Sequence, residues 1–303
     1  MFQERNMGIY VAGIDLGGTN LKFGIFNEKG IRLYMRVLRS VPGQSEATAQ
    51  QIAELIKASP IRVSMVGIGV PGTVFKPSGE VFSGNLKWPG VKFGSLLEEK
   101  IGLPVWMDND AQAALAAETL PGGSCFGLET AVYLTLGTGI GGALLINGRP
   151  WRGHDNGAGE LGHFVTHAGG LKCACGMKGC FEMYASAGAL ARLSGGVRAR
   201  SVIDRVRNGD EKMHAALRAY AQEVATGICS LYMLFRPQAI VLGGGVSAAG
   251  DILGNEILAQ IPDGYNFSKE DIQKALRFAT RGNDAGMAGA AKLALLNLKK
   301  ENQ

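Results

Sequence analysis

Apolar residues recur along the chain in short runs that end at glycine turns. The first run, 9–14, leads into Asp15-Leu16-Gly17-Gly18-Thr19, and an alternating run over 21–26 follows at once. A period of two predicts β-strands, so this region predicts a strand, a glycine turn and a return strand. Another apolar run begins at Ile31, after a predicted turn over 27–30.

The same arrangement returns in the second half of the chain. A strand predicted over 131–136 enters Gly137-Thr138-Gly139, and a strand predicted over 141–146 ends at Asn147-Gly148, a strong signal for a two-residue hairpin. The repeat predicts an α/β fold with two similar domains that face one another. Further strands are predicted over 66–70, 105–107 and 239–242, and helices over 111–118, 215–234 and 286–296.

Length and glycine content agree with this plan. A chain of 303 residues exceeds the size at which one hydrophobic core keeps growing, which favours two domains with a cleft between them. The 45 glycines are about twice the average share and indicate many tight turns or close backbone approaches. We predict a small domain over 1–118, completed by a C-terminal helix over 288–303, and a large domain over 119–287.

Charge and hydropathy narrow the function classes. The net charge of +5 is spread along the chain without a long Lys/Arg run, which argues against a nucleic-acid partner. No apolar stretch is long enough to span a bilayer, and the chain does not begin with the layout of a signal peptide. We therefore expect a cytoplasmic protein with no membrane partner, and the mild positive charge suits an anionic ligand such as a nucleotide.

The glycine turns are candidates for polyphosphate binding. The turn 15–19 offers backbone N–H groups without side chains, a hydroxyl, and an acidic residue that can hold Mg²⁺ through water. An ordinary hairpin that needs glycine for positive φ is the alternative. The stretch 137–142 also fits the G-x-G-x-x-G of dinucleotide-binding proteins, but that pattern should open a helix, and here it opens a predicted strand.

Two such turns, one from each domain, can hold the β- and γ-phosphates of ATP from opposite sides, and a third turn can let adenine pack on backbone. The residues that we expect to contact the nucleotide are Asp15, Gly17, Gly18, Thr19, Lys22, Gly137, Thr138, Gly139, Gly243, Gly244 and Gly245.

Three of the five cysteines lie within eight residues, and a histidine precedes them. Clustered thiols in a reducing compartment indicate a metal rather than a disulfide framework. A lone C-x-C or a lone histidine could be structural, but His163, Cys173, Cys175 and Cys180 together supply a tetrahedral Cys₃His set with no open position, as structural zinc requires.

Asp110 is a candidate general base. Attack by a hydroxyl on a phosphoryl group needs a carboxylate that accepts the proton. Asp110 follows a predicted strand, begins a predicted helix and precedes the domain boundary, a place that would point it into the cleft. On the sequence alone, a helix N-cap explains this residue equally well.

These motifs together resemble the superfamily of actin-like sugar kinases and heat-shock chaperone ATPases, and within it the ROK family. The discriminating stretch is Glu160-Leu161-Gly162-His163 followed by Cys173-Ala174-Cys175-Gly176-Met177-Lys178-Gly179-Cys180-Phe181-Glu182, similar to the family's E-x-G-H and C-x-C-G-x-x-G-C-x-E. The resemblance extends over about 9–296. It implies two actin-like (ribonuclease H-like) α/β domains and ATP-dependent phosphorylation of a hexose hydroxyl, with the 6-hydroxyl of glucose as the default.

The resemblance also implies roles for single residues. The segment Asn109-Asp110-Ala111-Gln112-Ala113-Ala114 is similar to the family's N-D-A-N-A-A, in which the Asp is the base and the Asn binds sugar, although Gln112 replaces the second Asn. Zinc is implied on His163, Cys173, Cys175 and Cys180, and sugar hydroxyls at the anomeric end on Glu160, His163 and Glu182. Gly72 and Asn85 match family segments that line the sugar site.

Several alternatives stay open at this point. Allose, fructose, mannose, N-acetylglucosamine and N-acetylmannosamine are substrates of family members with the same motifs. A sugar-sensing repressor would carry a helix-turn-helix module, for which we expect the eight residues ahead of the first strand to leave no room. A non-catalytic sugar-binding or chaperone-like ATPase would require neither Asp110 nor the cysteines. A homodimer is implied by the resemblance alone.

Overall fold

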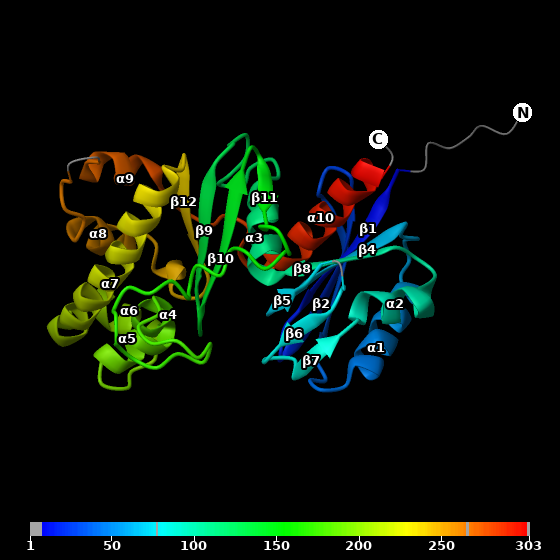
Figure 1. Ribbon diagram of the computed structural model, residues 1–303, viewed down its shortest axis with the longest axis horizontal. Helices are drawn as coiled ribbons and strands as arrows, with labels where there is room; N and C mark the ends of the chain where they lie inside the picture. The colour runs from blue at the N-terminus through cyan, green and yellow to red at the C-terminus, as the bar shows by residue number, and fades with distance from the viewer. Residues whose placement is uncertain (1–7, 77, 265–266, 302–303) are drawn as a thin grey trace, which may run out of the picture. The chain divides into compact units, whose positions relative to one another are not determined.

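The computed structural model describes residues 8–76, 78–264 and 267–301 of the chain, which divide into two compact units (Figure 1). Among these residues, unit 1 contains 8–126, 152–158 and 283–301, and unit 2 contains 127–151 and 159–282. The predicted domain limits, 1–118 with 288–303 and 119–287, stay a prediction, and their residues 1–7, 77, 265–266 and 302–303 lie outside the described residues.

Unit 1 is built on a five-stranded sheet with the order β3-β2-β1-β4-β8. Strands β1 to β3 form an antiparallel meander, and β4 and β8 run parallel to β1. A small three-stranded sheet, β5-β6-β7, belongs to the same unit. The strands of unit 1 are β1 (Tyr10–Leu16), β2 (Asn20–Asn27), β3 (Arg32–Arg39), β4 (Met65–Val70), β5 (Thr73–Val74), β6 (Val81–Ser83), β7 (Trp88–Val91) and β8 (Val105–Asn109).

Helices cover both faces of this sheet, because successive side chains of a strand point to opposite faces. Helices α1 (Ser45–Lys57) and α2 (Phe93–Ile101) pack on the face to which Ala12 and Ile14 of β1 contribute. The C-terminal helix α10 (Ala285–Glu301) packs on the other face, beside α3 (Asp110–Glu118), through small alanine side chains.

A row of glycines lets α10 approach the sheet at backbone distance. Gly13 of β1 is the register partner of both Gly24 of β2 and Gly67 of β4. A Cβ added at Gly13 would lie 2.0 Å from the carbonyl oxygen of Met287, and one at Gly67 would lie 2.0 Å from that of Ala290. Side chains at these positions would therefore push the helix away from the sheet.

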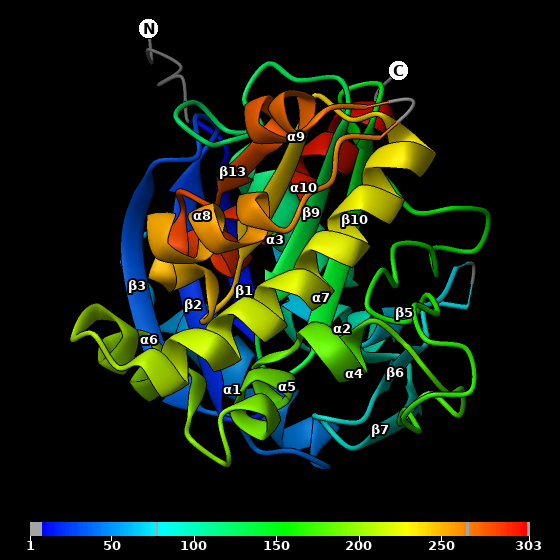
Figure 2. The same ribbon diagram turned by 90° about the vertical axis from the view of Figure 1, so that its left-hand side faces the viewer.

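Unit 2 repeats the strand plan of unit 1. Its sheet has the order β11-β10-β9-β12-β13, with β9 to β11 antiparallel and β12 and β13 parallel to β9. Figure 2 shows the long helix α7 lying across β9 and β10, where its buried face joins the core of the unit. The strands and helices of unit 2 are β9 (Ala131–Leu136), β10 (Ile140–Ile146), β11 (Arg149–Trp151), β12 (Ala239–Gly243), β13 (Leu276–Phe278), α4 (Glu182–Ala185), α5 (Ala187–Leu193), α6 (Ala199–Arg207), α7 (Glu211–Phe235), α8 (Asp251–Ala259) and α9 (Lys269–Ala275).

The α/β prediction with a repeated strand plan is confirmed. The hairpin between β10 and β11 turns at Asn147 and Gly148, with φ of 52° and 69°, as a two-residue turn of this kind requires. Among the helices of the described residues, we find none with both the length and the apolar character that crossing a membrane requires.

The glycine row predicts a stability effect. Gly67→Ala should destabilise unit 1 by about 1–3 kcal/mol, because its new methyl group meets helix backbone that cannot rotate away. Gly84→Ala is the control, since a Cβ there has no neighbour within 4 Å. Thermal unfolding of both variants measures the difference, and equal midpoints would contradict the close packing of α10.

Candidate functional site

The junction of β8 and α3 places the candidate base. Asn109 is the N-cap of α3, and its side-chain oxygen accepts from the backbone N–H groups of Ala111 (2.8 Å) and Gln112 (3.3 Å). Asp110 is therefore the first residue of the helix rather than its cap, and its carboxylate accepts from the N–H of Ala111 at 2.8 Å. The N-cap of α3 is thus Asn109, and the N-cap explanation does not apply to Asp110.

Two of the predicted sugar-site residues meet at this junction. The side-chain amide of Asn109 donates to the carbonyl of Gly72 at 2.9 Å. Gly72 has a φ of 117°, and a Cβ there would lie 2.2 Å from the carbonyl oxygen of Phe82, so only glycine fits. The structure brings Gly72, Asn109 and Asp110 together.

The first glycine turn lies at the end of β1. Its glycines do not have positive φ, which argues against the ordinary-hairpin explanation. A Cβ on Gly18 would lie 3.0 Å from the carbonyl oxygen of Asn85, so this predicted sugar-site residue packs against the turn. Asp15 forms an ion pair with Lys22 at 2.9 Å, and a Cβ on Gly286, in the first turn of α10, would meet its carboxylate.

The other two glycine turns of the prediction meet at the end of β9, in unit 2. The N–H of Gly137 donates to the carbonyl of Gly139 at 3.0 Å, which closes the second turn. Gly244, with a φ of 86°, is so close to Leu136 that a Cβ would lie 2.6 Å from its carbonyl oxygen. The N–H of Val246 donates to that same carbonyl at 3.0 Å. The turns at 137–139 and 243–245 are therefore neighbours.

Glu182 also belongs to this group, which the sequence did not reveal. Its carboxylate accepts from the N–H of Ile140 at 2.9 Å, and a Cβ on Gly139 would lie 2.3 Å from the same oxygen. A residue predicted to bind sugar thus contacts a turn predicted to bind phosphate. A side chain at position 139 would therefore clash with the carboxylate of Glu182.

The four predicted metal ligands converge. The ligand atoms of His163, Cys173, Cys175 and Cys180 all lie within 4.8 Å of one another. The Sγ of Cys173 is 3.5 Å from Nδ1 of His163, and the sulfurs of Cys175 and Cys180 are also 3.5 Å apart. Tetrahedral zinc with Zn–S bonds of about 2.3 Å separates its sulfurs by about 3.8 Å, so the donor set fits this metal.

The thiols of this cluster differ in acidity. Backbone hydrogen bonding from Met177 lowers the pKa of Cys175, and desolvation raises the pKa of Cys180 to about 12. Three thiolates this close repel one another, so they require a cation to ionise together.

Backbone contacts connect the cluster to the predicted sugar carboxylates. Glu160 is exposed, and its carbonyl accepts from the N–H of His163 at 3.0 Å. The N–H of Glu182 donates to the carbonyl of Gly162 at 2.8 Å. The segments that carry Glu160, His163 and Glu182 therefore lie side by side in unit 2.

A buried ion pair near Asp110 could not be predicted from the sequence. Asp108 is 1% exposed, and its carboxylate accepts from Nε of Arg152 at 2.6 Å. Burial raises the pKa of Asp108, while Arg152 acts in the opposite direction. The only available signal was an acidic residue at the end of a predicted strand.

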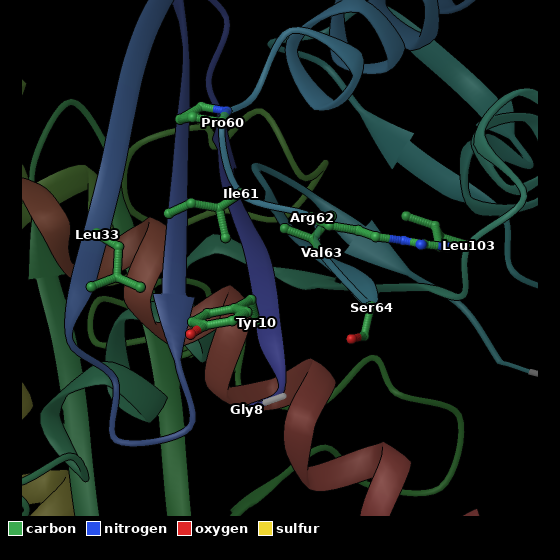
Figure 3. A pocket seen from close by; sticks show the side chains of 9 residues that line it. All are labelled: Gly8, Tyr10, Leu33, Pro60, Ile61, Arg62, Val63, Ser64 and Leu103. Atoms are coloured by element: carbon green, nitrogen blue, oxygen red, sulfur yellow. The ribbon is translucent and has the colours of Figure 1, made fainter. Parts of the chain in front are cut away.

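A cavity of about 670 Å³ lies elsewhere in unit 1 (Figure 3). It is lined at the start of β1 and before β4, by Tyr10, Ile61, Arg62 and Ser64 among others, with Leu33 and Leu103. The predicted site residues are at the other ends of these strands and do not line it.

Comparisons with known proteins agree in pointing to one family. The model of the ROK family matches residues 11–296. A glucokinase of Streptomyces coelicolor is 31% identical, covering 95% of this chain and 98% of the relative, and a putative xylose repressor of Caldicellulosiruptor sp. is 32% identical, covering 84% of this chain and 70% of the relative.

Solved structures agree with these relatives. The ROK family glucokinase of Streptomyces griseus, in complex with glucose and AMPPNP, has a TM-score of 0.81 at 30% identity, over 95% of this chain and 99% of that one. The ROK hexokinase of Thermus thermophilus has a TM-score of 0.81 at 32% identity, over 96% of this chain and 100% of that one. These similarities confirm the predicted actin-like fold class.

Proposed function

The chain belongs to the ROK family, and we propose that it transfers the γ-phosphoryl group of ATP to the 6-hydroxyl of glucose or a related hexose. It is an ATP-dependent sugar kinase, in agreement with the glucokinases that it resembles over nearly its whole length. The observation that carries the proposal is the β8–α3 junction, where Asn109 caps the helix and leaves Asp110 as a first-turn carboxylate beside Gly72.

Asp110 is the proposed general base. Its carboxylate takes the proton of the sugar hydroxyl as that oxygen forms its bond to the γ-phosphorus, while the bond to the bridging oxygen breaks and ADP leaves. Mg²⁺ neutralises charge on the phosphates in such transfers. Asp15, which forms an ion pair with Lys22, is the carboxylate that we propose to hold Mg²⁺ near the phosphates.

The glycine turns are the proposed nucleotide site. Each of the turns 15–19 and 137–139 would bind phosphate oxygens through backbone N–H groups, and Lys22 would assist the first. Contact between turns 137–139 and 243–245 supports assigning both to one nucleotide, with adenine on the backbone of the second.

The residues that we propose to bind sugar hydroxyls are Gly72, Asn85, Asn109, Glu160, His163 and Glu182. The Cys₃His set would hold a structural zinc ion, whose full ligand shell leaves no position for a catalytic water. His163 has two ring nitrogens, so Nδ1 can face the metal while Nε2 remains for a sugar hydroxyl.

Other hexoses are the main alternatives, namely allose, fructose, mannose, N-acetylglucosamine and N-acetylmannosamine. A sugar-sensing regulator is the alternative of another class, because a putative repressor is among the relatives. We also propose a cytoplasmic homodimer that binds no nucleic acid. Sugar-dependent ADP release separates the kinase from a regulator.

The first test of the kinase is Asp110→Asn. A coupled ADP-release assay over about a dozen hexoses should identify glucose or a close relative as the best substrate of the wild-type protein. The variant keeps the size of the side chain but cannot accept a proton, so kcat should fall by about two to four orders of magnitude. Asp251→Asn is the matched control, since Asp251 begins α8 after a glycine N-cap. Near-normal kcat in the first variant would remove Asp110 from the mechanism.

Gly137→Ala tests the nucleotide turn. A Cβ there meets its nearest protein atom at 3.7 Å, an ordinary contact, whereas one at Gly139 would displace Glu182. The methyl group should obstruct a phosphate and raise the KM for ATP by about tenfold, with little change in the KM for sugar. Gly94→Ala, with a nearest contact of 3.6 Å, controls for the added methyl group. An unchanged KM for ATP would contradict the assignment.

Cys175→Ser tests the zinc site. The variant should contain less than one zinc per chain by metal analysis, unfold at lower temperature and lose most of its sugar affinity. Binding of an ATP analogue should weaken less, because turn 137–139 keeps its own hydrogen bond. Cys229→Ser, outside the cluster, is the control. Equally tight sugar binding in zinc-free protein, measured by calorimetry, would show that the cluster does not organise the sugar site.

A further inference from the structure

We propose that Arg152 is a positioning residue for phosphoryl transfer: through its ion pair with Asp108, it holds segment 152–158 against the β8–α3 junction that carries Asp110. The inference rests on the proposed function, in which Asp110 is the base. It assigns a role to a buried pair that joins Asp108, near the end of β8, to segment 152–158.

The ion pair is almost fully enclosed. The Asp108 side chain is 2% exposed and that of Arg152 is 19% exposed. Oδ1 of Asp108 accepts from the N–H of Asn109 at 3.0 Å, while Oδ2 accepts from Nε of Arg152 at 2.6 Å. One carboxylate therefore connects the N-cap residue of α3 to segment 152–158.

Segment 152–158 has further contacts within unit 1. The side-chain amide of Asn156 donates to the carbonyl of Val74 at 2.8 Å, and the N–H of Lys76 donates to the carbonyl of Asp155 at 3.1 Å. Asn156 has a φ of 73°, a left-handed conformation that asparagine tolerates. The segment thus extends from β8 to the loop that follows β5.

Gln112 closes the other end of the segment. Its side-chain amide donates to the carbonyl of Ala158 at 3.4 Å, and the N–H of Ala158 donates to the carbonyl of Arg152 at 3.0 Å. Asp108, Asn109 and Gln112 therefore hold neighbouring loops around Asp110: the first and third bind segment 152–158, and the second binds Gly72. The glutamine, longer than the asparagine of the family pattern, reaches a carbonyl of this segment.

The pair also balances charge two residues from the base. The charged groups that face Asp108 are Arg152 and Lys76, whose ammonium group lies over the ring of Trp106 at 3.3 Å. If Asp108 lost its charge while Arg152 kept it, the extra positive charge would favour the ionised form of Asp110 and lower its pKa. Because activity increases as the base ionises, the acidic limb of the pH profile would then move to lower pH.

The experiment compares Asp108→Asn, Arg152→Met, Arg152→Lys and the double variant Asp108→Asn/Arg152→Met, using the hexose with the highest kcat/KM in the panel above. Both single charge-removing variants should lose about 10- to 100-fold in kcat/KM for sugar, because the junction shifts, with the KM for ATP unchanged within about twofold. Arg152→Lys keeps the charge and should recover part of this loss. Asp108→Asn should move the acidic limb of the pH profile down by about one unit.

The double variant keeps the test decisive if a single variant fails to fold, because removing both partners of a buried pair is often tolerated. The acidic limb of its pH profile should return to the wild-type position, while its kcat/KM for sugar should stay reduced. Arg205→Met, which breaks an exposed ion pair with Asp210, is the control and should change neither. If the double variant and every single variant that folds had the wild-type kcat/KM for sugar and the wild-type pH profile, with Asp110→Asn inactive, the inference alone would be overturned. An active Asp110→Asn would overturn the proposed function itself.

Discussion

The close contact between α10 and the sheet of unit 1 is the constraint on which the candidate base depends. Gly13 and Gly67 let the helix backbone lie on β1 and β4, and a Cβ on Gly289 would lie 1.6 Å from the carbonyl oxygen of Ala113 in α3. The last helix of the chain therefore holds both the sheet and the helix that Asp110 begins. Because backbone atoms make these close approaches, α10 cannot slide along the sheet by more than a fraction of a helical turn. The same contacts fix the position of the start of α3.

Close packing explains several glycines of the chain better than backbone conformation does. At Gly13, Gly67 and Gly139, φ is accessible to any residue, and what excludes a side chain is a neighbour at about 2 Å. At Gly72 and Gly244 both reasons apply. At these positions, glycine lets backbone and carboxylate groups pack without intervening side chains, which is also what a phosphate requires of the surface that binds it.

Local patterns predicted the repeated strand plan, the hairpin at Asn147 and Gly148, and the helices α3, α7 and α10, because periodicity and turn residues act within a few residues. The strands of the small sheet β5-β7 and the short helices α4, α5 and α9 are too short to show a hydrophobic periodicity that would predict them. The convergence of the four candidate metal ligands could be predicted because cysteine spacing is local. The pairing of Asp108 with Arg152, 44 positions apart, and the contact of Glu182 with turn 137–139 depend on tertiary packing, which a single sequence does not display.

The contact of Glu182 also changes how a structural metal could act. Cys180 is two residues before Glu182, whose carboxylate accepts from Ile140 at the start of β10 and whose N–H binds Gly162, next to His163. A carboxylate that accepts a backbone hydrogen bond from the end of turn 137–139 is oriented by that turn. An ion held by the Cys₃His set would fix the backbone near this carboxylate and so would restrict the turn in return. The predicted sugar ligand Glu182 and the turn 137–139 are therefore directly connected. Under the proposed function, a metal with a complete ligand shell would influence both substrates without touching either, because it would set the backbone positions from which their proposed ligands extend.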